Sequence, residues 1–275
     1  MVADGDAPAG DVARRRAHMP DGTRAILDTR SLQSDHRRLA ALLRPGLAVL
    51  DVGCGTGAIT RGIAEAVGHE GHAVGVDVNA SMIDAARAAH RRVPGLSFHV
   101  VDVYGLPFRG EFDIVAAARV LQWLADPGAA LREMTKALRR GGRMVILDYN
   151  HEKASWTPEP PASMRRFVAA FLRWRAAAGL DNAIADRLGE LLSGVGLTAI
   201  ATTDQSEVTR RSDPDFETRA GIWATIAATR GHQMVADAAI SEGERRAAEV
   251  EYRAWLGQAG QSHVQYLLAV EGVRP

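Results

Sequence analysis

The apolar and polar positions between residues 47 and 148 follow two alternating periods. Short apolar runs, each of a length typical of a buried strand, occur at 47–52, 72–76, 96–101, 112–117 and 143–148. The segments between them carry apolar residues at helical spacing, as at 58–67 and 128–138. Five strands that alternate with helices predict a parallel sheet with helices on both faces. We therefore expect an α/β fold with a doubly wound sheet.

The pattern changes on both sides of this region. Residues 11–44 predict one or two helices, with Pro45 and Gly46 as their end signal. Residues 149–161 are rich in proline and polar side chains and predict a loop. Helices are predicted at 164–178, 181–195, 214–229 and 241–256, and further strands at 197–203 and 262–271. About 55 residues separate the last two strands, which is long for a hairpin connection, so we expect a helical insert there.

These elements predict a single domain over residues 11–275. It consists of N-terminal helices at 11–44, a core at 45–150 that contains the expected binding site, and helical elements at 151–180 and 205–260 that cover this site. Residues 1–10 are rich in alanine, glycine and aspartate and predict a disordered tail.

Composition and charge narrow the classes of partner. The chain of 275 residues has 33 Lys and Arg and 33 Asp and Glu, so it lacks the basic excess of a nucleic-acid binder. No apolar run approaches the ~20 residues of a membrane span, and the N-terminus lacks the apolar core of a signal peptide. Cys54 is the one cysteine, which excludes an intramolecular disulfide and favours a reducing, cytoplasmic location. No Cys/His cluster has zinc spacing, so we expect no metal.

The most informative stretch is residues 49–57, Val-Leu-Asp-Val-Gly-Cys-Gly-Thr-Gly, at the end of the first strand. Its three alternating glycines, Gly53, Gly55 and Gly57, permit positive φ and let a ligand lie against bare backbone. A strand, a glycine turn and a helix N-terminus together make a nucleotide-sized site.

The glycines alone do not identify the nucleotide. Gly53, Gly55 and Ala58 also fit the pattern of dinucleotide-binding enzymes, and Asp77 lies where those enzymes have an acid. Asp51, just before the turn, argues against NAD, because a carboxylate there repels a pyrophosphate and suits a cationic ligand. S-adenosylmethionine carries an ammonium and a sulfonium and no phosphate. At this motif the chain resembles the class I S-adenosylmethionine-dependent methyltransferases.

The resemblance covers roughly residues 30–150. Asp77 ends the second strand and is followed by Val-Asn-Ala-Ser-Met. Asp102 ends the third strand and is followed by Val-Tyr-Gly-Leu-Pro-Phe. The stretch Arg-Arg-Gly-Gly at 139–142 is similar to the family's turn before strand five. The family implies a seven-stranded, mostly parallel, Rossmann-like sheet whose seventh strand is antiparallel. Ser81 is a candidate cap for the helix that follows the second strand.

The resemblance also implies how the cofactor binds. Asp77 would accept both ribose hydroxyls, Met82 would pack on the adenine face, and Asp102 with the amide of Val103 would bind the adenine edge. Cys54 is expected to pack in the turn and not to act as a nucleophile. The full set of predicted cofactor-binding residues is Asp51, Gly53, Cys54, Gly55, Gly57, Asp77, Val78, Met82, Asp102, Val103, Arg119 and Gln33.

Methyl transfer from a sulfonium needs alignment and exclusion of water, and it needs a base only when the nucleophile arrives protonated. The candidates are His151 and Tyr149 after the fifth strand and His36 in the N-terminal helices. Each candidate has a structural alternative. The alternatives are that His151 is an exposed loop histidine, that Tyr149 is a packed side chain, and that His36 is a capping or surface histidine. Arg119 follows the fourth strand and either pairs with the carboxylate of the cofactor or a substrate anion, or forms a salt bridge with a nearby acid.

We therefore expect a transferase that moves a methyl group from S-adenosylmethionine to a small-molecule acceptor by O-, N- or C-methylation in biosynthesis, with S-adenosylhomocysteine as product. The alternatives are an RNA or protein methyltransferase, a non-catalytic S-adenosylmethionine-binding protein and, more remotely, an NAD-dependent oxidoreductase. The expected partner is a small molecule, without nucleic acid or membrane, and the expected state is a monomer or homodimer.

Overall fold

The computed structural model describes residues 9–20 and 27–275. The expected disordered tail falls mostly on residues 1–8, outside the described residues, whereas Ala9 and Gly10 already belong to helix α1 (Ala9–Ala17). The described residues form two compact units. The sheet unit contains residues 27–148, 184–205 and 267–275, and the helical unit contains 9–20, 149–183 and 206–266. That the two units act as one domain stays a prediction.

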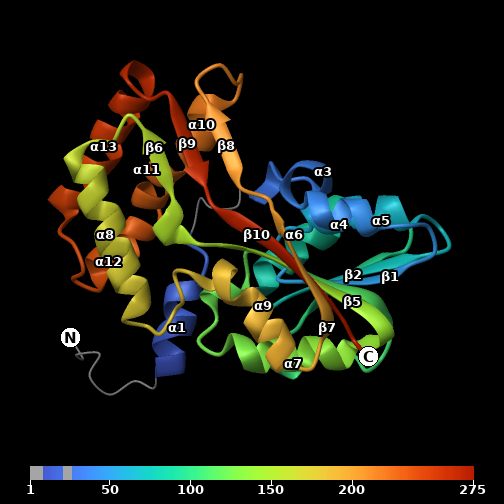
Figure 1. Ribbon diagram of the computed structural model, residues 1–275. Coiled ribbons are helices and arrows are strands. Elements are labelled where there is room, and N and C mark those ends of the chain that lie inside the picture. Colours follow the sequence, from blue (N-terminus) through green and yellow to red (C-terminus); the bar gives the residue numbers. More distant parts are fainter. Residues whose placement is uncertain (1–8, 21–26) are drawn as a thin grey trace. The chain divides into compact units, whose positions relative to one another are not determined.

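The sheet unit is built on seven strands in the order β3-β2-β1-β4-β5-β10-β7. Figure 1 labels β1, β2, β5, β7 and β10 of this sheet. Strand β1 pairs in parallel with β2 and β4, β2 pairs in parallel with β3, and β4 with β5, while β10 runs antiparallel to β7. The mostly parallel seven-stranded sheet predicted from the sequence is confirmed. The strand bounds are β1 Ala48–Val52, β2 His72–Asp77, β3 Leu96–Val100, β4 Phe112–Ala118, β5 Leu138–Tyr149, β7 Thr198–Asp204 and β10 Leu267–Val273.

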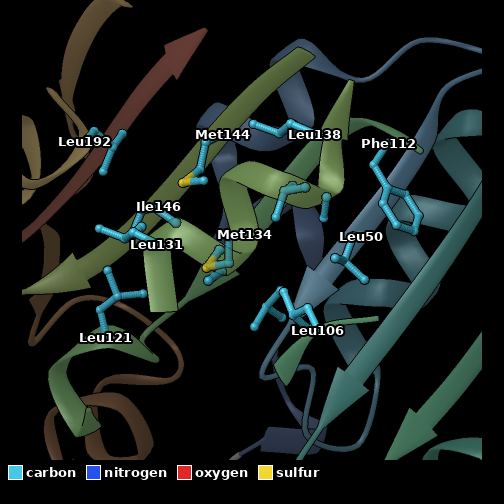
Figure 2. Packing of buried hydrophobic residues seen from close by; sticks show 14 of the residues in the cluster. Leu50, Leu106, Phe112, Leu121, Leu131, Met134, Leu138, Met144, Ile146 and Leu192 are labelled. Carbon is cyan, nitrogen blue, oxygen red and sulfur yellow. The ribbon is translucent and has the colours of Figure 1, made fainter. Parts of the chain in front are cut away.

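Strand β1 is buried on both of its faces. Val49 and Leu50 are neighbours in β1, yet they pack into different apolar clusters, and both are fully buried. The cluster of Leu50 includes Met134 and Ile146 (Figure 2). Burial on both faces explains why the strands are nearly continuous apolar runs without alternation. The helices of this unit are α3 Leu32–Asp35, α4 Arg37–Leu42, α5 Ala58–Val67, α6 Ala80–His90, α7 Pro127–Ala137 and α9 Ile184–Gly194.

Helix α6 begins differently from our expectation. Asn79, and not Ser81, is its N-cap: the Asn79 side chain accepts from the amides of Ser81 at 3.0 Å and Met82 at 3.3 Å. Asparagine is as good an N-cap as serine. Because the amide of Asn79 is itself held by Asp77 at 2.9 Å, the helix starts immediately after the β2 turn.

The helical unit also has a small sheet that the sequence did not predict. Strands β6 (Ser155–Thr157) and β8 (Glu207–Arg210) flank β9 (Ser262–Gln265), and both pairings are antiparallel. The loop prediction for 149–161 is therefore wrong over β6. The single strand predicted at 262–271 is also wrong: it is split near Tyr266 into β9, in the helical unit, and β10, in the sheet unit. The helices are α1, α8 Ala162–Ala176, α10 Phe216–Ala220, α11 Ile222–Ala228, α12 Arg230–Ala236 and α13 Glu242–Gln258.

Residues far apart in sequence attach α1 to the rest of the helical unit. The Arg16 guanidinium lies 4.9 Å from the centre of the Trp174 ring, and its Nε donates to Asp237 at 2.9 Å. The Trp174 indole also donates to Asp237, at 2.7 Å. A second arginine, Arg230, donates to the carbonyls of Arg16 and His18 at 2.7 and 3.3 Å and so satisfies the C-terminal end of α1.

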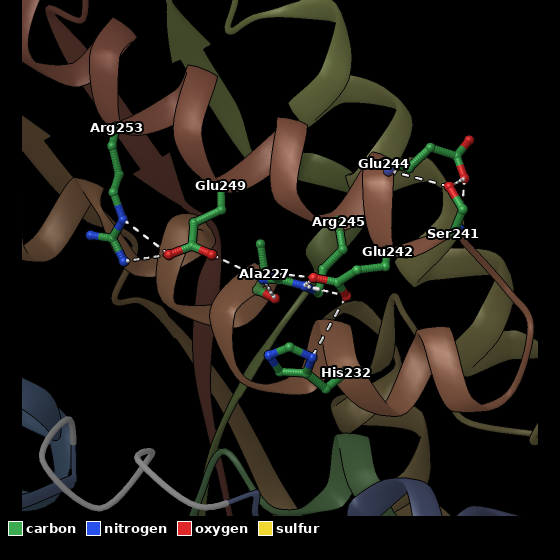
Figure 3. A network of polar contacts seen from close by, with 8 residues as sticks. All are labelled: Ala227, His232, Ser241, Glu242, Glu244, Arg245, Glu249 and Arg253. Carbon is green, nitrogen blue, oxygen red and sulfur yellow. Dashed lines mark hydrogen bonds and ion pairs between the residues drawn. The ribbon is translucent and has the colours of Figure 1, made fainter.

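Helix α13 begins with a capping box (Figure 3). The Ser241 hydroxyl accepts from the Glu244 amide at 3.2 Å, and the Glu244 carboxylate accepts from the Ser241 amide at 2.8 Å. One turn on, Arg245 donates to Glu242 at 2.8 Å, to Glu249 at 2.9 Å and to the Ala227 carbonyl of α11 at 3.2 Å. The network fixes the start of α13 against α11.

We predict that Ser241→Ala lowers the stability of the helical unit by about 1 kcal/mol, because it removes an N-cap hydrogen bond. The measurement is urea unfolding followed by tryptophan fluorescence. Ser212→Ala, at an exposed position between β8 and α10, serves as the matched control. Equal midpoints for the two variants would contradict a stabilising capping box.

Candidate functional site

The turn after β1 requires glycine for two separate reasons. Gly53, Gly55 and Gly57 have φ values of 72°, 54° and 78°, which side chains with a Cβ adopt at a cost. A Cβ on Gly53 would lie 2.4 Å from a Val120 methyl, and one on Gly57 would lie 2.5 Å from the Phe98 ring. The amides of Gly53 and Cys54 both donate to the Val76 carbonyl, at 2.7 and 3.0 Å, and this fixes the turn to β2.

Asp77 joins this turn to the end of β2. One of its carboxylate oxygens accepts from the Gly55 amide and the other from the Asn79 amide, each at 2.9 Å. Burial raises the pKa of Asp77, and its backbone donors oppose that shift. Each carboxylate oxygen has a second lone pair with which it can accept from a ligand hydroxyl. The next residue, Val78, is 70% exposed, so the chain presents an apolar side chain beside the carboxylate.

Asp51 is buried beneath the turn. Its carboxylate accepts from the Thr60 hydroxyl of α5 at 2.7 Å. Burial raises the pKa of Asp51 to about 7, and the negative charge of Asp77 adds to the shift, while Thr60 opposes it. A cation bound nearby would favour the ionised form of both acids. The sequence analysis did not identify Thr60, although it lies on the first turn of the helix that follows the glycines.

Cys54 is a packing residue in the structure. Its side chain packs with Ile83, Ala86 and Phe98, and burial raises the pKa of its thiol well above the usual value. A thiol in this environment is not a nucleophile at neutral pH.

Asp102 follows β3, whose end is tied to Asp77 because the Val101 amide donates to the Asp77 carbonyl at 3.0 Å. The Asp102 carboxylate accepts from the Tyr104 amide at 3.0 Å and begins the 3-10 turn η2 (Val103–Gly105). Met82 lies half-buried on α6. The glycines, Asp51, Asp77 and Asp102 thus come together where β1, β2 and β3 end.

Arg119 and His36 lie next to each other at the end of β4. Arg119 has a φ of 63°, and its guanidinium donates to the Asp35 carbonyl at 3.2 Å and pairs with the Asp35 carboxylate at 3.8 Å. The salt bridge that the sequence left as an alternative is therefore present, and a role of Arg119 toward a ligand stays a prediction. Gln33, on α3, is exposed.

His36 is fully buried, so its interpretation as a surface histidine is wrong. It lies at the junction of α3 and α4, and its side chain caps neither helix. Burial, together with the charge of Arg119, lowers the pKa of His36 to about 3. Within residues 9–20 and 27–275, neither ring nitrogen has a hydrogen-bond partner. Buried polar atoms are normally bonded, so this neutral imidazole is suited to a ligand or a water molecule.

The sequence analysis missed one further buried acid at the end of a strand. Asp148 closes the apolar run of β5, and its carboxylate accepts from the Gln122 amide at 3.1 Å. The signal was available, because Asp51, Asp77 and Asp102 were each identified by the same pattern of an acid at the end of a strand.

Tyr149 and His151 belong to the helical unit. Their rings stack with centroids 5.0 Å apart, and the His151 ring meets the edges of Phe171 and Trp223 at 6.1 and 6.5 Å. Burial and the positive charge of Arg175 lower the pKa of His151 well below its usual range. His151 is thus a neutral, partly buried imidazole among aromatic rings, and its interpretation as an exposed loop histidine is wrong.

In 9–20 and 27–275, no three His, Cys, Asp or Glu side chains gather closely enough to hold a metal ion. Across the same residues, no helix is long and apolar enough to cross a membrane.

Residues 43–176, nearly half of the chain, match a family model described as a methyltransferase domain. Among curated proteins, the chain is 35% identical over 122 residues to the ubiquinone/menaquinone biosynthesis C-methyltransferase UbiE of Shewanella frigidimarina, a match that covers 43% of this chain and 49% of that protein. The chain spans half or less of the length of the first curated relatives it matches.

Two solved structures share the fold at low identity. Phosphoethanolamine N-methyltransferase 2 of Haemonchus contortus, in complex with phosphomonomethylethanolamine and S-adenosylhomocysteine, matches with a TM-score of 0.59 at 17% identity, over 98% of this chain and 61% of that one. The [4+2]-cyclase SpnF matches with a TM-score of 0.54 at 18% identity, over 100% of this chain and 99% of that one. Likeness at this identity establishes the fold alone.

The raised pKa of Asp51 predicts a specific pH dependence of stability. Between its unfolded value near 3.8 and its folded value of about 7, the folded chain holds a proton that the unfolded chain has released. The contribution of Asp51 to stability is therefore lost as the pH rises through this window. Asp51→Asn keeps an acceptor for Thr60 and should lack this loss. The melting temperature of the variant minus that of the wild type should therefore increase from pH 4 to pH 7.

The measurement is a series of thermal melts at several pH values. Asp84→Asn, a side chain that is 75% exposed, is the control and should follow the wild type. A constant difference between Asp51→Asn and the wild type across the series would contradict the raised pKa.

Proposed function

We propose that this chain, as a class I S-adenosylmethionine-dependent methyltransferase, transfers a methyl group from S-adenosylmethionine to a small-molecule acceptor. When bound, S-adenosylmethionine supplies an electrophilic methyl group on a sulfonium and is left as S-adenosylhomocysteine. The observation that carries the proposal is the Asp77 carboxylate, whose two oxygens are each held by a backbone amide beside the glycine turn.

The residues at the strand ends fit the chemistry of this cofactor. In our proposal Asp77 accepts the two ribose hydroxyls. Val78, which is exposed, and Met82 contact the adenine ring, while Asp102 and the Val103 amide bind its edge. The glycine turn, with Gly53, Gly55, Gly57 and Cys54, lets the cofactor approach the backbone.

The buried acid supports a cationic ligand in preference to a dinucleotide. Asp51 and Asp77 repel each other electrostatically, and this repulsion contributes to the raised pKa of Asp51. A pyrophosphate would add negative charge to this pair, whereas an ammonium or sulfonium would relieve the repulsion. We further propose that Arg119, Gln33 and the neutral, buried His36 hold the amino-acid end of the cofactor.

A small-molecule acceptor is favoured by the balance of charge and by the relatives. Equal numbers of acidic and basic residues do not suit an RNA substrate. The UbiE relative is named for ubiquinone and menaquinone biosynthesis. We propose Tyr149 and His151, which follow the fifth strand, as the candidates for a base where the acceptor arrives protonated. SpnF, which has this fold, is described as a cyclase, so cofactor binding and methyl transfer must be tested separately.

We predict that Asp77→Ala weakens binding of S-adenosylhomocysteine by roughly ten- to a hundredfold, because it removes charge-assisted hydrogen bonds of about 1.5–3 kcal/mol. The measurement is isothermal titration calorimetry, with NAD titrated in parallel. The wild type should bind S-adenosylhomocysteine and not NAD. Asp84→Ala, an exposed acid of α6, should bind like the wild type. Tight binding of NAD without binding of S-adenosylhomocysteine would overturn the proposal.

We also predict that Gly55→Val abolishes cofactor binding while the sheet stays folded. Gly55 has a φ of 54°, and a Cβ there would lie 3.2 Å from a Leu27 methyl, within the region assigned to the cofactor. Gly110→Val is a matched control, because Gly110 has a φ of 68° with nothing within 4 Å of its Cβ. Both variants carry backbone strain, and only Gly55→Val should lose binding, as measured by calorimetry beside circular dichroism. Normal binding by Gly55→Val would show that the turn does not contact the ligand.

A further inference from the structure

Thr60 is a buried residue beside the candidate cofactor site to which the proposed function gives no role. It is the third residue of α5 and is fully buried. Its hydroxyl donates to the Asp51 carboxylate at 2.7 Å. Because β1 ends at Val52 and α5 begins at Ala58, this hydrogen bond joins the strand and the helix on the two sides of the glycine turn.

The Thr60 hydroxyl has a different kind of acceptor from that of Thr135, a threonine of α7. The Thr135 hydroxyl donates to the Leu131 carbonyl, four residues earlier in its own helix, at 2.8 Å. This local bond is common for threonine in helices. A hydroxyl has one proton, so Thr60, which donates to Asp51, does not donate to the carbonyl of Thr56. The fold thus directs the one proton of the Thr60 hydroxyl to the buried acid.

Asp51 has fewer hydrogen-bond donors than Asp77. The amides of Gly55 and Asn79 hold the two carboxylate oxygens of Asp77, each at 2.9 Å. In the described part of the chain, the Thr60 hydroxyl is the one donor to the Asp51 carboxylate. Asp51 is also only 4% exposed, so bulk water solvates it poorly. A buried carboxylate is costly to ionise unless donors stabilise its charge, so the ionisation of Asp51 depends on Thr60.

The titratable groups beside Asp51 add no positive charge. Burial raises the pKa of Asp51 to about 7, the Thr60 hydrogen bond opposes the shift, and the negative charge of Asp77 adds to it. The Cys54 thiol in the turn stays neutral at pH 7, because burial and the charges of both acids raise its pKa well above the usual value. Among the described residues, no cationic side chain forms an ion pair with Asp51. A bound cation would therefore supply a charge that these residues lack.

The other charged groups on the elements around β1 have defined positions or partners. His72 of β2 and Asp113 of β4 lie beside Ala48, at the opposite end of β1 from the turn. The cationic groups of α5, of α6 and at the end of β4 have these partners: Arg61 with Glu65 at 2.8 Å, Arg87 with Asp84 at 3.5 Å and the Phe98 carbonyl at 2.8 Å, His90 with the Thr56 carbonyl at 3.1 Å, and Arg119 with Asp35 at 3.8 Å. Because these cations are engaged elsewhere, burial, Thr60 and Asp77 govern the protonation of Asp51.

We propose that Thr60 is a positioning residue for the cofactor: its hydroxyl stabilises the ionised form of Asp51, which attracts the cationic end of S-adenosylmethionine, and Asp51 releases its proton to solvent as the cofactor binds. This rests on the proposed function, because the positive charge is that of the cofactor. The O–H bond of the Asp51 carboxyl breaks, the proton passes to water or buffer, and the ammonium of the cofactor balances the carboxylate that remains. Without the Thr60 hydroxyl, Asp51 keeps its proton up to a higher pH.

The first measurement counts the protons that the full chain releases when it binds S-adenosylhomocysteine, which carries the same ammonium group. Calorimetric titrations at pH 7 in two buffers with different ionisation enthalpies give this number. We expect about half a proton per molecule bound, because Asp51, with a pKa of about 7, is half protonated before binding and ionised afterwards. The number should fall towards zero at higher pH, and Asp51→Asn should lack this release.

The second measurement compares the affinity for S-adenosylhomocysteine across a series of pH values in variants of Thr60. Thr60→Val keeps the shape of the side chain and removes the hydroxyl. Its affinity should be roughly tenfold below that of the wild type near pH 6 and should approach the wild-type value near pH 9. Thr60→Ser keeps the donor and should follow the wild type throughout. Thr135→Val removes a half-buried hydroxyl from another helix of the sheet unit and should also follow the wild type.

A wild type that binds S-adenosylhomocysteine and releases no more protons than Asp51→Asn would overturn this inference. A loss of affinity in Thr60→Val by the same factor at every pH would also overturn it, because a merely structural role has that effect. If Thr60→Val does not fold, Thr60→Ala, which places a better helix former at this position, replaces it, and the proton count of the wild type requires neither variant. A wild type that binds no S-adenosylhomocysteine at any pH contradicts the proposed function instead.

Discussion

The pairing of β1 with β2 on one side and β4 on the other is the constraint on which the candidate cofactor site depends. The register places Asp51 opposite Gly75 and Ala116, so the buried acid has the smallest possible side chains beside it in the sheet. A Cβ on Gly75 would lie 2.6 Å from the Phe98 ring and 2.9 Å from the Cys54 sulfur. Because all three strands run in parallel, their carboxyl ends meet at one edge, and the polar residues that follow them converge there.

That edge combines groups that a folded chain ordinarily keeps apart. Two carboxylates, Asp51 and Asp77, are held close to one another and away from bulk water, and both have raised pKa values. The buried imidazole of His36 has no hydrogen-bond partner in the described part of the chain. Arrangements of this kind reduce the stability of the unliganded protein, and they are typical of sites that a ligand completes. The backbone donors to Asp77 offset part of this cost.

The sheet and its polar edge could be predicted from the sequence because the signals are local. A strand buried on both faces is a continuous apolar run, and the residues at its end are fixed by the strand itself, as for Asp51, Asp77 and Asp102. Strands β6 and β8 escaped prediction because they are three and four residues long. Whether a residue such as His36 is buried depends on what packs over it, and no local pattern carries that information. The same holds for Arg175, which is fully buried although it lies on a helix with three other arginines.

The order of segments in the two units has a consequence for how the chain is made. The sheet unit receives its first five strands, β1 to β5, from a continuous stretch that emerges early during synthesis. The helical unit is assembled from three separate segments, 9–20, 149–183 and 206–266. The Arg16–Asp237 contact spans 221 residues, and β9 supplies the centre of the small sheet only from residue 262 onward. On the ribosome, α1 therefore emerges before the strands of the parallel core but is packed after them, because its partners are translated later than those strands.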